Sequence, residues 1–110
     1  MDKRSLYKGC LEPVILQLLQ DNNRMYGYEI TQKVKELTKG ELNITEGALY
    51  PLLHKLEASG TLEVEMENIG NRVRKYYKLT KAGKKQTAIA AEELNTFLET
   101  MQLLLKPKTA

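Results

Sequence analysis

The sequence has few of the residues from which enzymes build catalytic and metal sites. Its 110 residues include one cysteine and one histidine, and they include no tryptophan. A single Cys10 cannot form an intrachain disulfide or a multi-cysteine metal site, and a single His54 leaves no histidine cluster. No glycine-rich phosphate loop is present. The sequence therefore predicts a protein that is not an enzyme, with no metal and no cofactor.

Long apolar runs are also missing. No run approaches the roughly 20 residues that span a bilayer, and no apolar stretch of the kind found in secretory signals follows the charged residues 1–4. We expect no membrane partner and a cytoplasmic location. Cys10 lies beside an apolar helical stripe, so it is either a reduced thiol packed in a core or interface or a reactive thiol.

Apolar residues three and four positions apart predict helices in the first half of the chain. The first helix spans about residues 8–20, where Pro13 is tolerable only in the first turn, and residues 21–23 end it. A second helix begins at Gly27 and closes near Gly40. Its inner face carries Ile30, Val34 and Leu37.

The third helix has two unlike faces. Thr45 is a good N-cap, with Ile44 and Leu49 placed to form a hydrophobic staple. The expected buried face is Leu49, Leu52, Leu53 and Leu56, and the opposite face is Glu46, Gly47, Tyr50, Pro51 and His54. Pro51 breaks a local rule inside this helix, unless the helix starts later and Pro51 lies in its first turn. The outer face is small and hydrogen-bonding near its start, which suits insertion into a DNA major groove.

A β-hairpin and a long helix complete the chain. Residues 62–67 alternate as a half-buried strand, 68–71 form a turn, and 73–79 return as a second strand. Depending on the register of the hairpin, Glu63 and Glu65 face Lys78 and Tyr76, and Glu63, Glu65 and Glu67 form the solvated side. The last helix runs from Thr80 to about Lys106, and a frayed tail follows it. Its apolar stripe is Leu94, Phe97, Leu98, Met101, Leu104 and Leu105.

The expected fold is therefore mostly α with a small β-hairpin: a winged helix-turn-helix over residues 1–80, then a dimerisation helix and tail over 81–110. A helix of about 40 Å extends beyond what so small a domain can cover, and a second copy of the chain is the simplest partner for its stripe.

The basic residues are unevenly distributed. Residues 68–91 hold seven of the 17 Lys and Arg residues and none of the 14 Asp and Glu residues, although the formal net charge is only +3. This block is either a phosphate-facing edge or a solvated lysine surface. We assign Arg72, Arg74 and Lys75 to the wing, where they would meet phosphates or enter the minor groove.

The other candidate DNA contacts lie on the two preceding helices. Tyr26, Gly27 and Tyr28 could hold a phosphate at a helix start, although Tyr28 is equally well a core residue. Thr45, Glu46, Gly47 and Ala48 would lie deepest in the groove, with Tyr50 and Pro51 on the sugar-phosphate wall. His54 is either a phosphate contact or a plain surface histidine, and Lys55 either a phosphate contact or a generic exposed lysine.

The chain resembles the PadR family of bacterial transcriptional regulators. Three blocks carry the resemblance: YGYEI (residues 26–30), EGALYPLLHKLE (46–57) and RKYYKLTKAG (74–83). The family implies an N-terminal winged helix-turn-helix and a C-terminal dimerisation helix. It also implies operator binding as a homodimer, usually as a repressor. The chain's length matches the short subgroup with a single C-terminal helix. Some of that subgroup stack planar drugs on a tryptophan at the dimer interface, where this chain has Leu94.

The leading hypothesis is a homodimeric repressor that binds a two-fold DNA operator. An alternative is a sensor of small hydrophobic effectors whose site, at the dimer interface, is lined by Leu94, Phe97, Leu98 and Met101. A winged-helix module used only for protein contacts is a third possibility, against which the basic wing argues.

Overall fold

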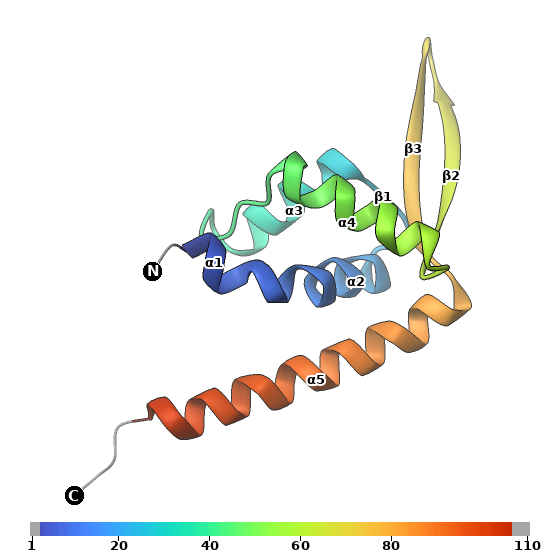
Figure 1. Cartoon of the computed structure of the whole chain (residues 1–110). Coiled ribbons are helices and arrows are strands. Elements are labelled where there is room, and N and C mark those ends of the chain that lie inside the picture. The colour runs from blue at the N-terminus through green and yellow to red at the C-terminus, as the bar shows by residue number, and fades with distance from the viewer. Residues whose placement is uncertain (1–2, 107–110) are drawn as a thin grey trace, which may run out of the picture.

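The computed structural model describes residues 3–106 and is mostly helical (Figure 1). The elements run α1 (Lys3–Tyr7), the 3-10 turn η1 (Lys8–Cys10), α2 (Leu11–Asp21), β1 (Met25–Tyr26), α3 (Gly27–Leu37), α4 (Glu46–Ala58), β2 (Leu62–Ile69), β3 (Arg72–Leu79) and α5 (Lys81–Leu105). This order confirms the expected helices, hairpin and long last helix. The expectations for residues 1–2 and for most of the C-terminal tail lie outside the described residues.

The first expected helix is divided. Residues 8–10 form η1, and α2 begins only at Leu11, so Pro13 lies in the first turn of α2. Amides in a first turn have no intrahelical acceptor, so the proline removes no helical hydrogen bond there. The helix ends near the expected place, where the Asn22 amide donates to the Leu18 carbonyl at 2.9 Å.

Helix α3 ends at Leu37, and its last turn is closed by the Gly40 amide, which donates to the Lys35 carbonyl at 2.8 Å, as the expected closure near Gly40 requires. The chain turns there through positive φ angles at Lys39 and Gly40. Ile30 and Val34 are buried as expected, but Leu37 is 63% exposed. Periodicity along one helix identifies an apolar stripe, but it does not show how much of that stripe other elements cover.

Helix α4 begins where its cap predicts. The Thr45 hydroxyl oxygen accepts a hydrogen bond from the Ala48 amide at 3.2 Å, and Pro51 lies within the helix. The alternative of a later start is therefore wrong. Leu49, Leu53 and Leu56 are buried, whereas Leu52, expected to be buried with them, is only partly covered at the edge of the core.

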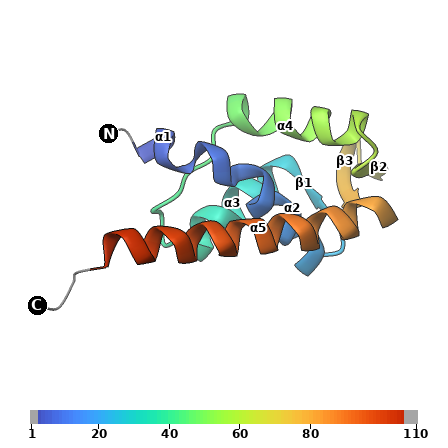
Figure 2. The same cartoon turned by 60° about the horizontal axis from the view of Figure 1, so that its bottom comes forward.

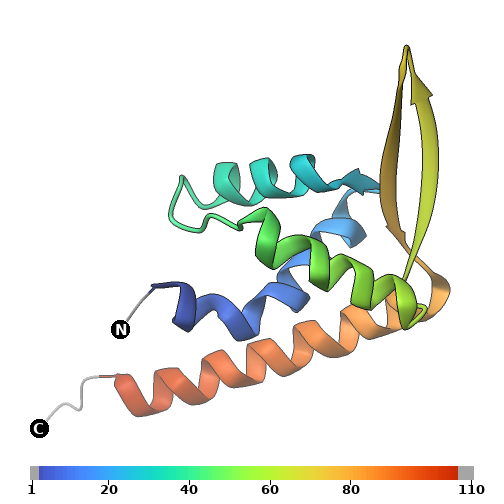
Figure 3. The ribbon, with the colours of Figure 1, turned by 45° about the horizontal axis from the view of Figure 1, so that its top comes forward.

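The hairpin belongs to a three-stranded antiparallel sheet in the order β1-β3-β2. Glu63 lies opposite Lys78 and Glu65 opposite Tyr76, as predicted. The two-residue strand β1, which the sequence did not predict, pairs with Tyr76 and Tyr77 of β3. The distal parts of β2 and β3 project from the helical body as the wing (Figure 1, Figure 3).

Helix α5 runs alongside α2, and α4 lies on the far side of the domain (Figure 2). Thr80 caps the start of α5, because its hydroxyl oxygen accepts a hydrogen bond from the Gly83 amide at 2.9 Å. The buried residues of α5 all lie in its first half: Gly83, Thr87 and Ala90. In the second half, Phe97 and Leu98 are about half exposed, and Leu104 and Leu105 are at least 70% exposed. No helix within residues 3–106 is long and apolar enough to cross a membrane.

Candidate nucleic-acid interface

The outer face of α4 is open to solvent. Its exposed candidates are Thr45, Glu46, Gly47, Ala48, Pro51, His54 and Lys55, and only Tyr50 among the α4 candidates is half-buried. The buried leucines lie on the opposite side and anchor the helix to the core. The helix thus presents the small, polar first turn that the sequence predicts, unobstructed by any other described segment.

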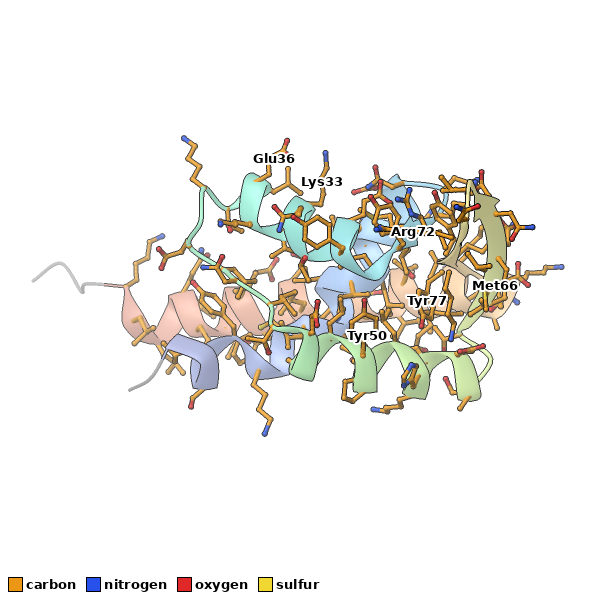
Figure 4. All side chains as sticks on the ribbon, turned by 90° about the horizontal axis from the view of Figure 1, so that it is seen from above. Lys33, Glu36, Tyr50, Met66, Arg72 and Tyr77 are labelled. Carbon is orange, nitrogen blue, oxygen red and sulfur yellow. The ribbon has the colours of Figure 1, made fainter. Side chains whose placement is uncertain are left out.

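A hollow of about 530 Å³ lies between the start of α3, helix α4 and the wing. Its lining includes seven residues that the sequence assigns to DNA binding: Tyr26, Gly27, Tyr28, Tyr50, Arg72, Arg74 and Lys75. Ile69, Val73 and Tyr77 complete it. Tyr50, Arg72 and Tyr77 can be located in this region in Figure 4. Segments up to about 50 residues apart in the sequence therefore converge on one concave surface.

Gly27 allows α4 to approach α3. A Cβ atom built at Gly27 would lie 2.4 Å from the Tyr50 hydroxyl oxygen, well inside van der Waals contact. Any side chain at residue 27 would therefore displace the Tyr50 ring. Tyr28, the next residue, is 60% exposed at the rim of the hollow. Its environment is that of a surface residue, so the alternative of a core tyrosine is wrong.

Two arginines flank a pair of tyrosines at the base of the wing. The Arg24 guanidinium lies 3.9 Å from the centre of the Tyr76 ring, and that of Arg74 lies 4.1 Å from the centre of the Tyr26 ring. The two rings meet edge to face at 5.6 Å. Such cation–π and aromatic contacts fix the wing relative to the start of α3.

The carboxylates of β2 are not the plain solvated side that the sequence suggested. Glu65 accepts hydrogen bonds from Arg24 at 3.0 Å and from Lys78 at 3.1 Å, and Glu67 accepts another from Arg24. The bonds from Lys78 and Arg24 lower the pKa of Glu65, and the bond to Glu65 raises the pKa of Lys78. Pattern analysis missed Arg24, because its partners lie about 40 residues away.

The candidate cations differ in how freely they can meet a phosphate. Lys75 lies 3.7 Å from Glu57 of α4, and Lys55 lies 3.7 Å from Glu12 of α2. Arg72 is exposed near the wing tip and forms no ion pair with another described residue. Exposed ion pairs with separations of 3.7 Å are weak, so Lys75 and Lys55 could each exchange a carboxylate partner for a phosphate.

The residues expected at an effector site divide between two hollows on α5. Leu94 and Phe97 line one of about 460 Å³ against α1, η1 and α2, which also includes Cys10. Leu98 and Met101 line another of about 450 Å³ near the end of α5. Cys10 is half-buried. Within residues 3–106, no group of three or more His, Cys, Asp or Glu side chains could hold a metal ion.

Comparison with known proteins assigns the chain. Residues 15–89 match the model of the transcriptional regulator PadR-like family. The chain belongs to this family. It is therefore a transcriptional regulator with a winged-helix fold, and DNA binding is the activity that the PadR-like family implies.

Individual relatives agree with this assignment. A protein X from Lysinibacillus sphaericus is 30% identical over 93% of this chain and all of its own length. A transcriptional regulator from Clostridium thermocellum superposes with a TM-score of 0.85 at 26% identity, covering 93% of this chain and 99% of its own. A PadR-like regulator from Bacillus cereus gives 0.79 at 28% identity, covering 94% and 99%.

Proposed function

We propose that the protein is a repressor that binds a two-fold DNA operator as a homodimer in the cytoplasm, where the chromosome is accessible. The observation that carries this proposal is the convergence of the start of α3, Tyr50 of α4 and the cationic wing on one hollow, next to a helix α4 whose outer face is open to solvent. Helix α4 would enter the major groove, and the wing would lie against the neighbouring phosphates or minor groove.

Each element has a chemical task in this arrangement. Thr45 or Ala48 would contact a thymine methyl group, and Glu46 would accept a hydrogen bond from a cytosine amino group. Gly47 carries no side chain and lets the backbone approach the base edges. Arg72 and Arg74 would neutralise phosphates, which supplies affinity without sequence preference.

Fluorescence anisotropy with operator fragments selected from the source genome tests the DNA contact. Arg72→Glu is expected to weaken binding to all sequences and to reduce the salt dependence by about one log unit for each phosphate that is no longer neutralised. Lys106→Glu makes the same charge change at the far end of α5 and serves as the control. Equal effects of the two substitutions would show that the wing does not touch DNA.

The apolar second half of α5 supports the homodimer. A helix of 25 residues is about 37 Å long, and its exposed stripe includes Phe97, Leu98, Leu104 and Leu105. Burial of each such side chain in an interface would stabilise a dimer by about 1.5–3 kcal/mol. Two copies related by a two-fold axis would also present two α4 helices to a two-fold site.

Light scattering coupled to size-exclusion chromatography tests the dimer. Leu98→Glu places a charge in the stripe and is expected to give a monomer at micromolar concentration. Leu103→Glu is the matched control, because Leu103 points away from the stripe by helical spacing and is 78% exposed. A monomeric parent chain, or equal dissociation by both substitutions, would refute this interface.

A second candidate function is sensing of a small hydrophobic effector. The hollow lined by Leu94 and Phe97, of about 460 Å³, favours it, because it borders the apolar stripe of α5. Saturable Nile red fluorescence that Phe97→Ala abolishes would support an effector site there. Absence of saturable binding would show that this hollow does not take a hydrophobic effector.

A further inference from the structure

The charged side chains on one face of the wing do not pair as their positions suggest. In the antiparallel register, Glu67 lies directly opposite Arg74, and alternation along the strands places both side chains on the same face. Directly opposite residues have Cβ atoms about 4.5–5.5 Å apart, so opposite charges there normally pair. By position alone, Arg74 would be the partner of Glu67.

Instead, both carboxylates near this position are held by Arg24. One amino group of its guanidinium donates to Glu65 at 3.0 Å, and the other donates to Glu67. Arg24 comes from the turn before β1, on a different segment from the wing. Its side chain is 32% exposed and those of Glu65 and Glu67 just over 40%, so the cluster is half-covered.

The groups in direct contact with Arg74 are consequently neutral. Its guanidinium lies over the Tyr26 ring at 4.1 Å, and one of its nitrogens is 3.5 Å from the Tyr76 hydroxyl oxygen. Glu29, another nearby carboxylate, accepts a hydrogen bond from the Tyr26 amide at 3.3 Å. Arg74 borders the hollow beside α4 with no ion pair to any other described side chain.

We propose that Arg24 is a positioning residue that keeps Arg74 available for a DNA phosphate by holding Glu67 away from it. This role rests on the proposed DNA-binding function. A guanidinium paired with a carboxylate has little net charge to offer a phosphate, so it releases fewer counterions on binding. Loss of Arg24 frees Glu67 to turn across the strand pair to Arg74, and the wing then masks its own phosphate contact.

The experiment measures operator affinity against salt concentration for Arg24→Ala. We expect the slope of log affinity against log salt to fall by about 0.9 per wing, which corresponds to about an eightfold loss of affinity per wing at 0.1 M salt. Adding Glu67→Gln to Arg24→Ala is expected to restore both slope and affinity, because Arg74 is then free again. A role of Arg24 in wing stability alone would not be reversed by removal of a carboxylate.

The matched control is Glu63→Gln in the same Arg24→Ala background. It removes one negative charge from the same strand face, but Glu63 lies opposite Lys78 rather than Arg74. The effect of Glu63→Gln therefore measures how much operator affinity rises when any one negative charge is removed from this face. If Glu67→Gln restores the affinity and salt slope of Arg24→Ala no more than Glu63→Gln does, the proposal is overturned.

A variant that leaves Arg24 in place covers the case in which Arg24→Ala does not fold. In the otherwise unaltered chain, Glu67→Gln is expected to change affinity no more than Glu63→Gln, because Arg24 already occupies Glu67. A distinctly larger gain for Glu67→Gln would show that Glu67 competes for Arg74 even with Arg24 present, and would refute the role.

The outcomes distinguish failure of the proposed role of Arg24 from failure of the proposed DNA-binding function. If the parent chain binds no DNA at low salt, the proposed function fails and the role of Arg24 fails with it. If the parent binds and Arg24→Ala keeps its full salt slope while thermal unfolding shows it folded, only the role of Arg24 is wrong.

Discussion

The junction between the wing and α5 requires a glycine, and Gly83→Ala is expected to destabilise the protein. A Cβ atom at residue 83 would lie 2.1 Å from the Thr61 carbonyl oxygen and 3.1 Å from its carbon. The obstruction is backbone rather than a flexible side chain, so the first turn of α5 would have to move by roughly 1 Å to reach ordinary contact.

The magnitude follows from the hydrogen bonds that this movement disturbs. The Thr61 carbonyl accepts from the Thr80 amide at 3.1 Å, and the Thr80 hydroxyl donates to the Gly60 carbonyl and accepts from the Gly83 amide. Loss of about three such bonds costs about 3 kcal/mol, against which the better helix propensity of alanine returns about 1 kcal/mol. The net loss of about 2 kcal/mol corresponds to a decrease in Tm of roughly 10 °C.

Thermal unfolding followed by circular dichroism at fixed protein concentration measures this loss. Gly47→Ala in α4 is the matched control, because a Cβ there would have its nearest neighbour 4.0 Å away, at the Thr45 hydroxyl oxygen. It is expected to raise stability by up to about 1 kcal/mol through helix propensity alone. A Gly83→Ala variant that melts at or above the parent temperature would refute the argument from close approach.

Three further substitutions test other parts of the structure. Gly27→Ala is expected to displace the flexible Tyr50 ring, lowering operator affinity in anisotropy titrations with only a small change in Tm; unchanged affinity would mean that Tyr50 does not help to shape the DNA-binding surface. Thr45→Ala removes the α4 cap and should cost about 1 kcal/mol in urea unfolding, whereas Thr45→Ser should retain it. Hydrogen bonds from Lys78 and Arg24 lower the pKa of Glu65 below its ordinary value of 4.5. Ionised Glu65 therefore stabilises the folded state fully above pH 4.5, and this stabilisation is lost as the pH falls through the lowered pKa. Glu65→Gln should therefore be less stable than the parent at pH 7, and the difference should shrink at acidic pH; a constant difference would contradict the ion-pair network.

Local sequence rules were sufficient for most helices and for the hairpin. Thr45 set the start of α4 because a capping hydroxyl satisfies an amide within three residues. Alternation along residues 62–67 identified a strand with one covered face, because successive side chains of a strand point to opposite faces. Both signals act between neighbours in the sequence or across a tight turn, so they can be read without tertiary structure.

The candidate site was predictable as a set of residues but not as a geometry. The residues assigned to α4 are exposed or half-buried at its surface, and those assigned to α3 and the wing line one hollow. The sequence did not show that Tyr50 packs against Gly27, or that Lys55 lies near Glu12 of α2. These relations depend on how close separate elements approach, and helical periodicity carries no information on that distance.

The sequence by itself determined where α2, α3, α4, α5 and the hairpin form to within a few residues, which helix face is mostly apolar, and that positive charge concentrates on the wing and the start of α5. Only the tertiary structure decided that β1 joins the sheet, that Leu37 stays exposed and that Arg24 rather than Arg74 pairs with Glu67. The physical reason is range. Backbone propensity and side-chain period act over a few residues, whereas the choice among several cations for one carboxylate depends on which distant segments the folded core brings together.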